Sequence, residues 1–103
     1  MNKLISVIIP AYNAEDTIEN CIKSITLDDD IEIIVVIDGA TDNTERVCRR
    51  LNNNNLKIIK QENKGPYEAR KNGIQNATGK YLMFLDSDDT YTENTITKVK
   101  EIL

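Results

Sequence analysis

Two acidic residues that stand two positions apart are the most chemically suggestive feature of the sequence. Asp86 and Asp88 directly follow the apolar run Tyr81–Leu85, which has the composition of a β-strand. In extended backbone such a pair lies on one side, about 7 Å apart. Two carboxylates so placed can hold Mg²⁺ or Mn²⁺ and leave its other positions to phosphate oxygens. The alternative is a turn that caps the next helix.

Polar residues also follow three earlier apolar runs. Pro10-Ala11-Tyr12-Asn13 follows residues 4–9, Asp38-Gly39-Ala40-Thr41-Asp42 follows residues 31–37, and Glu62-Asn63-Lys64-Gly65 follows residues 56–59. If these runs are parallel strands, their carboxyl ends meet at one edge of the sheet, where open α/β sheets bind ligands. We therefore expect one site built from these junctions.

Several function classes are disfavoured by what the 103-residue sequence lacks. It has no histidine, which removes His-based triads, His general bases and His metal ligands. It has neither G-x-G-x-x-G nor a P-loop, so a bound phosphate would need a metal ion rather than a glycine-rich loop. The net charge of -4 argues against a nucleic-acid-binding surface.

Helical periodicity separates the apolar runs, which predicts one α/β domain in the order βαβαβαβα with a central parallel sheet. Residues 18, 21, 22 and 25, for example, share one apolar face. Pro10 is expected to stop the first strand. The predicted helix starts are Asn13, Asp42 with Glu45, Pro66, and Thr90 with Glu93. Small residues at 69, 73 and 77 predict that the helix opened by Pro66 lies close to the sheet, and Gly79 is expected to end this helix.

The two cysteines, Cys21 and Cys48, fall on apolar helix faces, which predicts buried free thiols in a reducing compartment. No apolar run reaches the ~18 residues that span a membrane. The N-terminal apolar stretch is broken by Ser6 and Pro10, unlike a signal peptide. We expect a cytoplasmic protein.

Taken together, the motifs resemble the N-terminal half of a family 2 glycosyltransferase of the GT-A fold. The resemblance covers essentially the whole chain, in four ordered segments. They are Ser6-Val7-Ile8-Ile9-Pro10-Ala11-Tyr12-Asn13, residues 32–44 around Asp38-Gly39, residues 65–74 around Ala69-Arg70, and Gly79 through Asp86-Ser87-Asp88-Asp89.

This resemblance implies a Rossmann-like half-domain that binds a nucleotide-diphosphate sugar, usually a UDP-sugar. The parent would be a hexosyltransferase that passes the sugar, with inversion, to a hydroxyl of a glycan, lipid-linked or protein acceptor, as in polysaccharide and cell-wall biosynthesis. Mg²⁺ or Mn²⁺ would neutralise the diphosphate leaving group. The parent enzyme would work in the cytoplasm, at the inner face of the membrane in some members.

The same resemblance implies residue roles by motif position. A pocket for uracil and ribose would be lined by residues 10–12, with Asp38 facing the base. For Arg70, the alternative to nucleotide binding is a surface salt bridge. For Glu15, the alternative is a favourable charge interaction with a helix N-terminus. The implied nucleotide-binding residues are Pro10, Ala11, Tyr12, Glu15, Asp38, Arg70, Asp86 and Ser87; the implied metal ligands are Asp88, the first choice, and Asp86.

The sequence departs from the family pattern at Ile37, where a carboxylate is usual, at Ala40 in place of serine, and at Lys71 in place of asparagine. Inversion also needs a general base, and none can be assigned here, so we expect it beyond residue 103. The chain is then expected to be a fragment that binds the donor and transfers little or nothing.

Two other functions remain as alternatives. One is a non-catalytic nucleotide- or metal-binding half-domain that acts with a partner. The other is a signalling receiver domain, which is disfavoured because receivers carry paired acids after the first strand and a lysine after a fifth strand. Here Pro10-Ala11-Tyr12-Asn13 follows the first strand, and no fifth strand is predicted.

Overall fold

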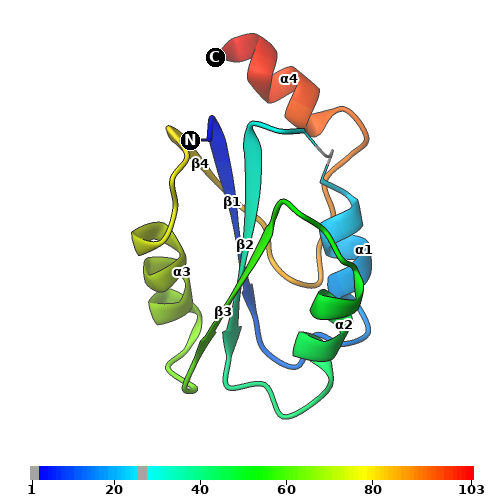
Figure 1. Cartoon of the computed structure of the whole chain (residues 1–103), viewed down its shortest axis with the longest axis vertical. Helices are drawn as coiled ribbons and strands as arrows, with labels where there is room; N and C mark the ends of the chain where they lie inside the picture. Colours follow the sequence, from blue (N-terminus) through cyan, green and yellow to red (C-terminus); the bar gives the residue numbers. More distant parts are fainter. Residues whose placement is uncertain (1–2, 26–27) are drawn as a thin grey trace.

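The computed structural model describes residues 3–25 and 28–103 and contains a parallel four-stranded sheet (Figure 1). The strands lie in the order β3-β2-β1-β4, and every neighbouring pair is parallel. The predicted α/β fold is therefore confirmed. The strands are β1 (Ile5–Ala11), β2 (Ile31–Asp38), β3 (Leu56–Gln61) and β4 (Tyr81–Phe84).

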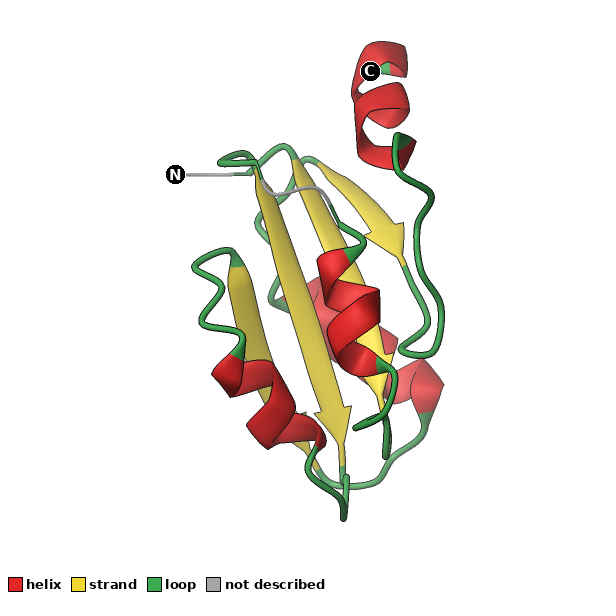
Figure 2. Cartoon of the chain, turned by 90° about the vertical axis from the view of Figure 1, so that its right-hand side faces the viewer, coloured by secondary structure: helices red, strands yellow, loops and turns green. Residues whose placement is uncertain are grey.

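Helices cover both faces of this sheet (Figures 1 and 2). The covering helices are α1 (Ile18–Lys23), α2 (Thr44–Arg50) and α3 (Pro66–Gln75), and the last helix is α4 (Thr95–Ile102). The chain steps from β1 to β2 to β3 in one direction, so right-handed crossovers place α1 and α2 on the same face. It then returns past β1 to β4, which places α3 on the other face. The strand order thus reverses beside β1, between β2 and β4.

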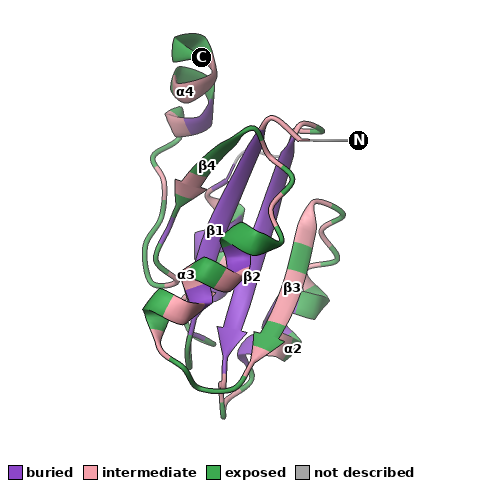
Figure 3. Ribbon diagram, turned by 90° about the vertical axis from the view of Figure 1, so that its left-hand side faces the viewer, coloured by how far each residue is buried: buried purple, intermediate pink, exposed green. Residues whose placement is uncertain are grey.

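The central strands β1 and β2 are buried almost throughout, whereas β3 and β4 are partly exposed (Figure 3). The main core lies between the sheet and the inner faces of α1 and α2. Cys21 and Cys48 belong to this core as free thiols, as predicted. Burial raises the pKa of Cys21 to about 12 and that of Cys48 to about 11, so both thiols stay protonated.

Helix α3 packs closely on the sheet because it presents small residues there. Ala69 is fully buried, and a Cβ atom on Gly73 would lie 2.6 Å from Cγ2 of Ile8. The predicted close approach is thus confirmed at these two positions. The predicted end of the helix is wrong, because α3 ends at Gln75 and Gly79 lies in the turn before β4.

Pro10 does not stop β1, contrary to the prediction. Strand β1 continues to Ala11, with Pro10 opposite Val36 of β2, whereas the pairing of β1 with β4 ends at Ile8. The carbonyl of Ile8 accepts a hydrogen bond from the N–H of Leu85, so the peptide groups of residues 8 and 10 face β4. Pro10 has no N–H to offer on that side, and the two strands separate there.

Three predicted helix starts are wrong, and at two of them the side chain bonds across a loop. Asn13 has φ 47° and accepts a hydrogen bond from the N–H of Thr41, and Asp42 accepts one from the N–H of Glu15. Asp42 also accepts hydrogen bonds from the N–H and hydroxyl of Thr44, so its partners are local as well as distant. The predicted starts were Asn13, Asp42 with Glu45, and Thr90 with Glu93; α1, α2 and α4 begin at Ile18, Thr44 and Thr95.

Helix α4 lies beyond the amino ends of the strands (Figure 2). Its Ile96 is buried, and its Lys100 forms ion pairs with Asp28 at 2.6 Å and Asp30 at 3.0 Å. These two acids belong to the Asp28-Asp29-Asp30 segment before β2. In the parts of the chain that the structure describes, no helix has the length and apolar character needed to cross a membrane.

A buried carboxylate crosslinks the end of the sheet opposite the strands' carboxyl ends. Glu32 on β2 is 2% exposed and accepts hydrogen bonds from the Ser6 hydroxyl at 2.5 Å and from the backbone N–H and hydroxyl of Thr78. Its other oxygen lies 2.8 Å from Nζ of Lys57. Burial raises the pKa of Glu32, but these partners together lower it to about 2. The network joins three strands to the turn before β4.

This network predicts a specific acid sensitivity. The pKa of Glu32 in the folded protein is below its usual value of 4.5, so its stabilisation is present above pH 4.5 and is lost as pH falls toward 2. We expect Glu32→Gln to lower the free energy of unfolding at pH 7 by roughly 3 kcal/mol, and by much less at pH 2.5. Urea denaturation at both pH values measures this, with the exposed Glu62→Gln as control. An equal loss at both pH values would contradict the prediction.

Candidate functional site

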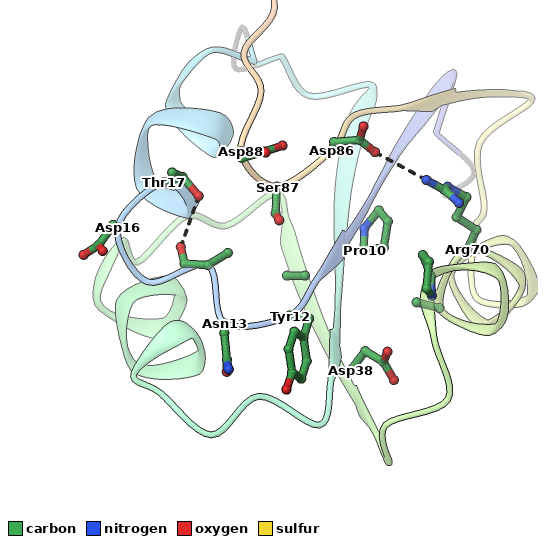
Figure 4. A pocket seen from close by; sticks show the side chains of 14 residues that line it. Pro10, Tyr12, Asn13, Asp16, Thr17, Asp38, Arg70, Asp86, Ser87 and Asp88 are labelled. Carbon is green, nitrogen blue, oxygen red and sulfur yellow. Dashed lines mark hydrogen bonds and ion pairs between the residues drawn. The ribbon is translucent and has the colours of Figure 1, made fainter.

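A cavity of about 480 Å³ opens at the carboxyl ends of β1 and β4, where the strand order reverses (Figure 4). It contains every residue that the sequence analysis assigned to a site except Glu15, whose carboxylate lies 3.4 Å from the side-chain amide of Asn43. The lining residues are Pro10, Ala11, Tyr12, Asn13, Ala14, Asp16, Thr17, Asp38, Pro66, Ala69, Arg70, Asp86, Ser87 and Asp88.

The segment that follows β1 forms one wall of the cavity. Tyr12 is half exposed there, beside Pro10 and the buried Ala11. The segment is fixed from α2, because the N–H of Ala14 donates to the hydroxyl of Thr44 at 2.8 Å. The backbone of this segment is therefore held by the first residue of α2, 30 residues away in the sequence.

Sequence reasoning missed several lining residues. The predicted helix start at Asn13 puts Asp16 and Thr17 inside a helix, whereas in the structure both residues precede α1. Pro66 and Ala69 line the cavity from α3, where the sequence indicated only a helix start and a packing position. Pro66 and Ala69 lie close in sequence to Arg70, which was already assigned to the site, and this proximity could have indicated that they line the cavity.

Asp38 ends β2 and organises the loop that leads into α3. Its Oδ1 accepts hydrogen bonds from the side-chain amide of Gln61 at 2.9 Å and the N–H of Lys64 at 2.7 Å, and its Oδ2 accepts one from the N–H of Gly65 at 2.9 Å. Gly65 has φ 95°, which suits glycine. Burial raises the pKa of Asp38, but the three donors outweigh it and lower the pKa, so the carboxylate is ionised.

The opposite wall is the segment that follows β4. The Asp86 carboxylate lies 3.4 Å from NH2 of Arg70 on α3, and Figure 4 shows it pointing toward that guanidinium and away from Asp88. Both partners are substantially exposed, so the pair is easily exchanged for other ions. Within the described part of the chain, the Asp88 carboxylate forms no ion pair and accepts no hydrogen bond.

The side chains that could act as metal ligands limit what this wall can bind. Among the described residues, no three acidic or cysteine side chains come together in an arrangement that holds a metal ion. Asp86 and Asp88 supply only carboxylate oxygens, which suit a hard divalent cation that takes its remaining ligands from water or a bound phosphate. The protein residues alone therefore form a partial metal site.

A family model described as Glycosyl transferase family 2 matches residues 6–103. The chain belongs to this family. The match covers both walls of the cavity, and it confirms the resemblance predicted from the four motifs.

Relatives agree with this assignment. The chain is 37% identical to the minor teichoic acid biosynthesis protein GgaA of Bacillus subtilis, over 93% of this chain and 24% of GgaA. Its structure superposes with a TM-score of 0.88 on S. aureus TarS 1–349 in complex with UDP, at 30% identity, covering 95% of this chain and 31% of that one.

A second solved structure contains a metal ion. Glucosyl-3-phosphoglycerate synthase from Mycobacterium tuberculosis, in complex with Mn²⁺, UDP and glucosyl-3-phosphoglycerate, superposes with a TM-score of 0.73. It is 28% identical, over 85% of this chain and 36% of that one. The chain therefore spans about a quarter to a third of the length of these three proteins.

The contacts of Asp38 predict that it stabilises the fold as well as lining the cavity. In Asp38→Asn, the side-chain NH₂ would face N–H donors, so we expect the free energy of unfolding to fall by about 1–3 kcal/mol. Asp16→Asn, at an exposed carboxylate on the cavity rim, serves as the matched control and should change stability little. Urea denaturation of both variants measures the difference, and equal stabilities would contradict a loop-holding role for Asp38.

Proposed function

We propose that this chain is the donor-binding part of a glycosyltransferase that moves a sugar from a nucleotide-diphosphate sugar, a UDP-sugar in particular, to an acceptor hydroxyl. The observation that carries the proposal is the cavity itself, which combines the unpaired Asp88 and the Asp86–Arg70 pair on one side with Asp38 and Tyr12 on the other. The UDP bound to TarS and the UDP and Mn²⁺ bound to the mycobacterial synthase support this donor class.

The nucleoside would occupy the side formed by Tyr12 and Asp38. Uracil has an N3–H donor between two carbonyl groups, and an ionised carboxylate is a strong acceptor for it. Oδ2 of Asp38 accepts only one hydrogen bond, from Gly65, so it retains a lone pair for a second donor. Ile37 and Ala40 lie beside this region, which is where the chain departs from the usual family pattern.

The diphosphate would occupy the side formed by Arg70, Asp86, Ser87 and Asp88. The carboxylates of Asp88 and Asp86 fit Mg²⁺ or Mn²⁺, which when bound would offset the negative charge of the departing diphosphate. The guanidinium of Arg70 can turn from Asp86 to phosphate oxygens, since its planar set of donors matches both partners. The protein would thereby orient the donor before transfer.

Transfer with inversion requires a base near the acceptor hydroxyl, on the side opposite the leaving group. We assign this role to no residue of the chain, because Asp38 is held by three donors and Asp86 and Asp88 are the proposed metal ligands. The proposal leaves the base and the acceptor site to a part of the enzyme outside residues 1–103. A hexosyl donor and a cytoplasmic reaction remain predictions within this proposal.

A second candidate is a half-domain that binds the nucleotide and metal without catalysing transfer. The absence of an assignable base among the described residues favours it. Full transfer activity in a longer form of the enzyme, lost on replacing Asp88, would exclude this candidate.

Calorimetric titration of UDP into the chain, with and without Mn²⁺, tests the donor site. We expect Mn²⁺ to strengthen UDP binding at least about tenfold and Asp88→Ala to abolish this increase, because one of two protein carboxylate ligands is lost. Asp89→Ala removes a neighbouring exposed carboxylate outside the cavity lining and should keep the increase. UDP binding that is the same with and without Mn²⁺ would contradict the metal assignment.

The Arg70–Asp86 pair predicts opposite effects of one substitution. Arg70→Ala removes a hydrogen-bond donor to phosphate oxygens, so UDP binding without metal should weaken by about two- to fivefold. The same substitution frees the Asp86 carboxylate to bind a metal ion, so Mn²⁺ binding without UDP should strengthen by about two- to fivefold. Arg46→Ala, which removes an exposed arginine from α2, is the control. Calorimetry with UDP and electron paramagnetic resonance with Mn²⁺ measure the two affinities. A decrease in both would mean that Arg70 does not compete for Asp86.

A further inference from the structure

The acidic segment that carries Asp86 and Asp88 leaves the sheet after Leu85, and Tyr91 anchors its far end. The hydroxyl of Tyr91 donates a hydrogen bond to the carbonyl of Phe84, the last residue of β4, at 2.8 Å. One side chain thereby connects the end of the segment to its beginning. We call residues 85–91 the acidic loop.

The carbonyl of Phe84 is available because of the strand pattern. The N–H groups of Tyr81 and Leu85 donate to carbonyls at positions 4 and 8, so these odd-numbered residues face β1. Peptide groups alternate in direction along a strand, and the carbonyl of Phe84 therefore faces the free edge of the sheet. No described strand lies beyond β4, so Tyr91 supplies the partner that a neighbouring strand would provide.

A second set of bonds holds the acidic loop to α1. The N–H of Tyr91 donates to the hydroxyl of Ser24 at 3.0 Å, and that hydroxyl donates to the carbonyl of Cys21 at 2.7 Å. The thiol of Cys21 donates to the carbonyl of Asp86 at 3.4 Å. Both ends of the loop thus attach to one turn of helix.

Tyr91 is suited to a fixed hydrogen bond. Its ring packs against the main core while its hydroxyl reaches Phe84. Burial raises the pKa of Tyr91 to about 12, so the phenol is a hydrogen-bond donor at neutral pH. Three carboxylates, at positions 86, 88 and 89, repel one another within the loop, and the anchor opposes its spreading.

We propose that Tyr91, together with Ser24, is a positioning residue that holds Asp86 and Asp88 toward the cavity before a divalent cation binds. The identity of the ligand rests on the proposed function, whereas the anchoring itself rests on the contacts of Tyr91. A loop that is already ordered loses less conformational freedom on binding, so the anchor should strengthen cation-dependent binding in particular. Nucleotide contacts on the Asp38 side should not depend on it.

The test is Tyr91→Phe, which removes the hydroxyl and keeps the ring, with Tyr81→Phe as the matched control on β4. Calorimetry measures UDP affinity with and without Mn²⁺. We expect Tyr91→Phe to weaken binding in the presence of Mn²⁺ by about three- to tenfold, the range of one net hydrogen bond, with metal-free UDP binding unchanged. Tyr81→Phe should match the wild type in both. Unchanged binding in Tyr91→Phe, or an equal loss with and without Mn²⁺, would overturn the positioning role.

Two further measurements separate this proposal from the proposed function. Ser24→Ala should weaken Mn²⁺-dependent binding in the same direction, and the double variant should lose less than the two single losses combined, because both act on one loop. Hydrogen exchange at residues 86–90 should be faster in Tyr91→Phe, and exchange in β1 and β2 unchanged. If the wild type shows no Mn²⁺-dependent binding, the proposed function fails. In that case, faster hydrogen exchange confined to the acidic loop of Tyr91→Phe still supports the anchoring role of Tyr91. Unchanged hydrogen exchange in this variant overturns the anchoring role.

Discussion

The cavity depends on one missing hydrogen-bond donor. Pro10 has no N–H to offer toward β4, so the β1–β4 ladder ends at Ile8 while β1 stays paired with β2 as far as Ala11. The strands diverge from that point, one leading to Tyr12 and the other to Asp86. A donor at position 10 would favour further pairing and bring these two segments together. The space between them is thus a consequence of the backbone, and the polar side chains only line it.

The charged side chains around this space are mostly acidic. Hydrogen bonds from the loop before α3 keep Asp38 ionised, and two more carboxylates face it across the cavity. In the structure Arg70 offsets one of them, Asp86. Because carboxylates and phosphates repel, an anionic diphosphate would bind more weakly here without added positive charge. Under the proposed function a divalent cation would supply that charge and leave Arg70 free to contact phosphate.

Much of this arrangement was predictable, because it depends on local pattern. Apolar runs located the strands, small residues located the close approach at Gly73, and three of the polar junctions after the strands located part of the cavity lining. Some features that the sequence did not indicate involve partners distant in sequence. Asn13 bonds to Thr41 rather than starting a helix, and Glu32 sits in an apolar run because its partners come from other strands and a turn. Composition and periodicity do not encode such pairings.

The two walls of the cavity differ in how they are held. Asp38 ends a strand whose residues are all buried, and three donors fix its carboxylate. Asp86 and Asp88 follow an edge strand of four residues, of which Leu82 and Phe84 are 40% and 46% exposed. Beyond the buried Leu85, burial orders that wall little, so its order depends on Tyr91 and on contacts with α1. Under the proposed function, the wall that holds Asp38 would contact the nucleobase of the donor, and the less buried wall would hold the metal ion.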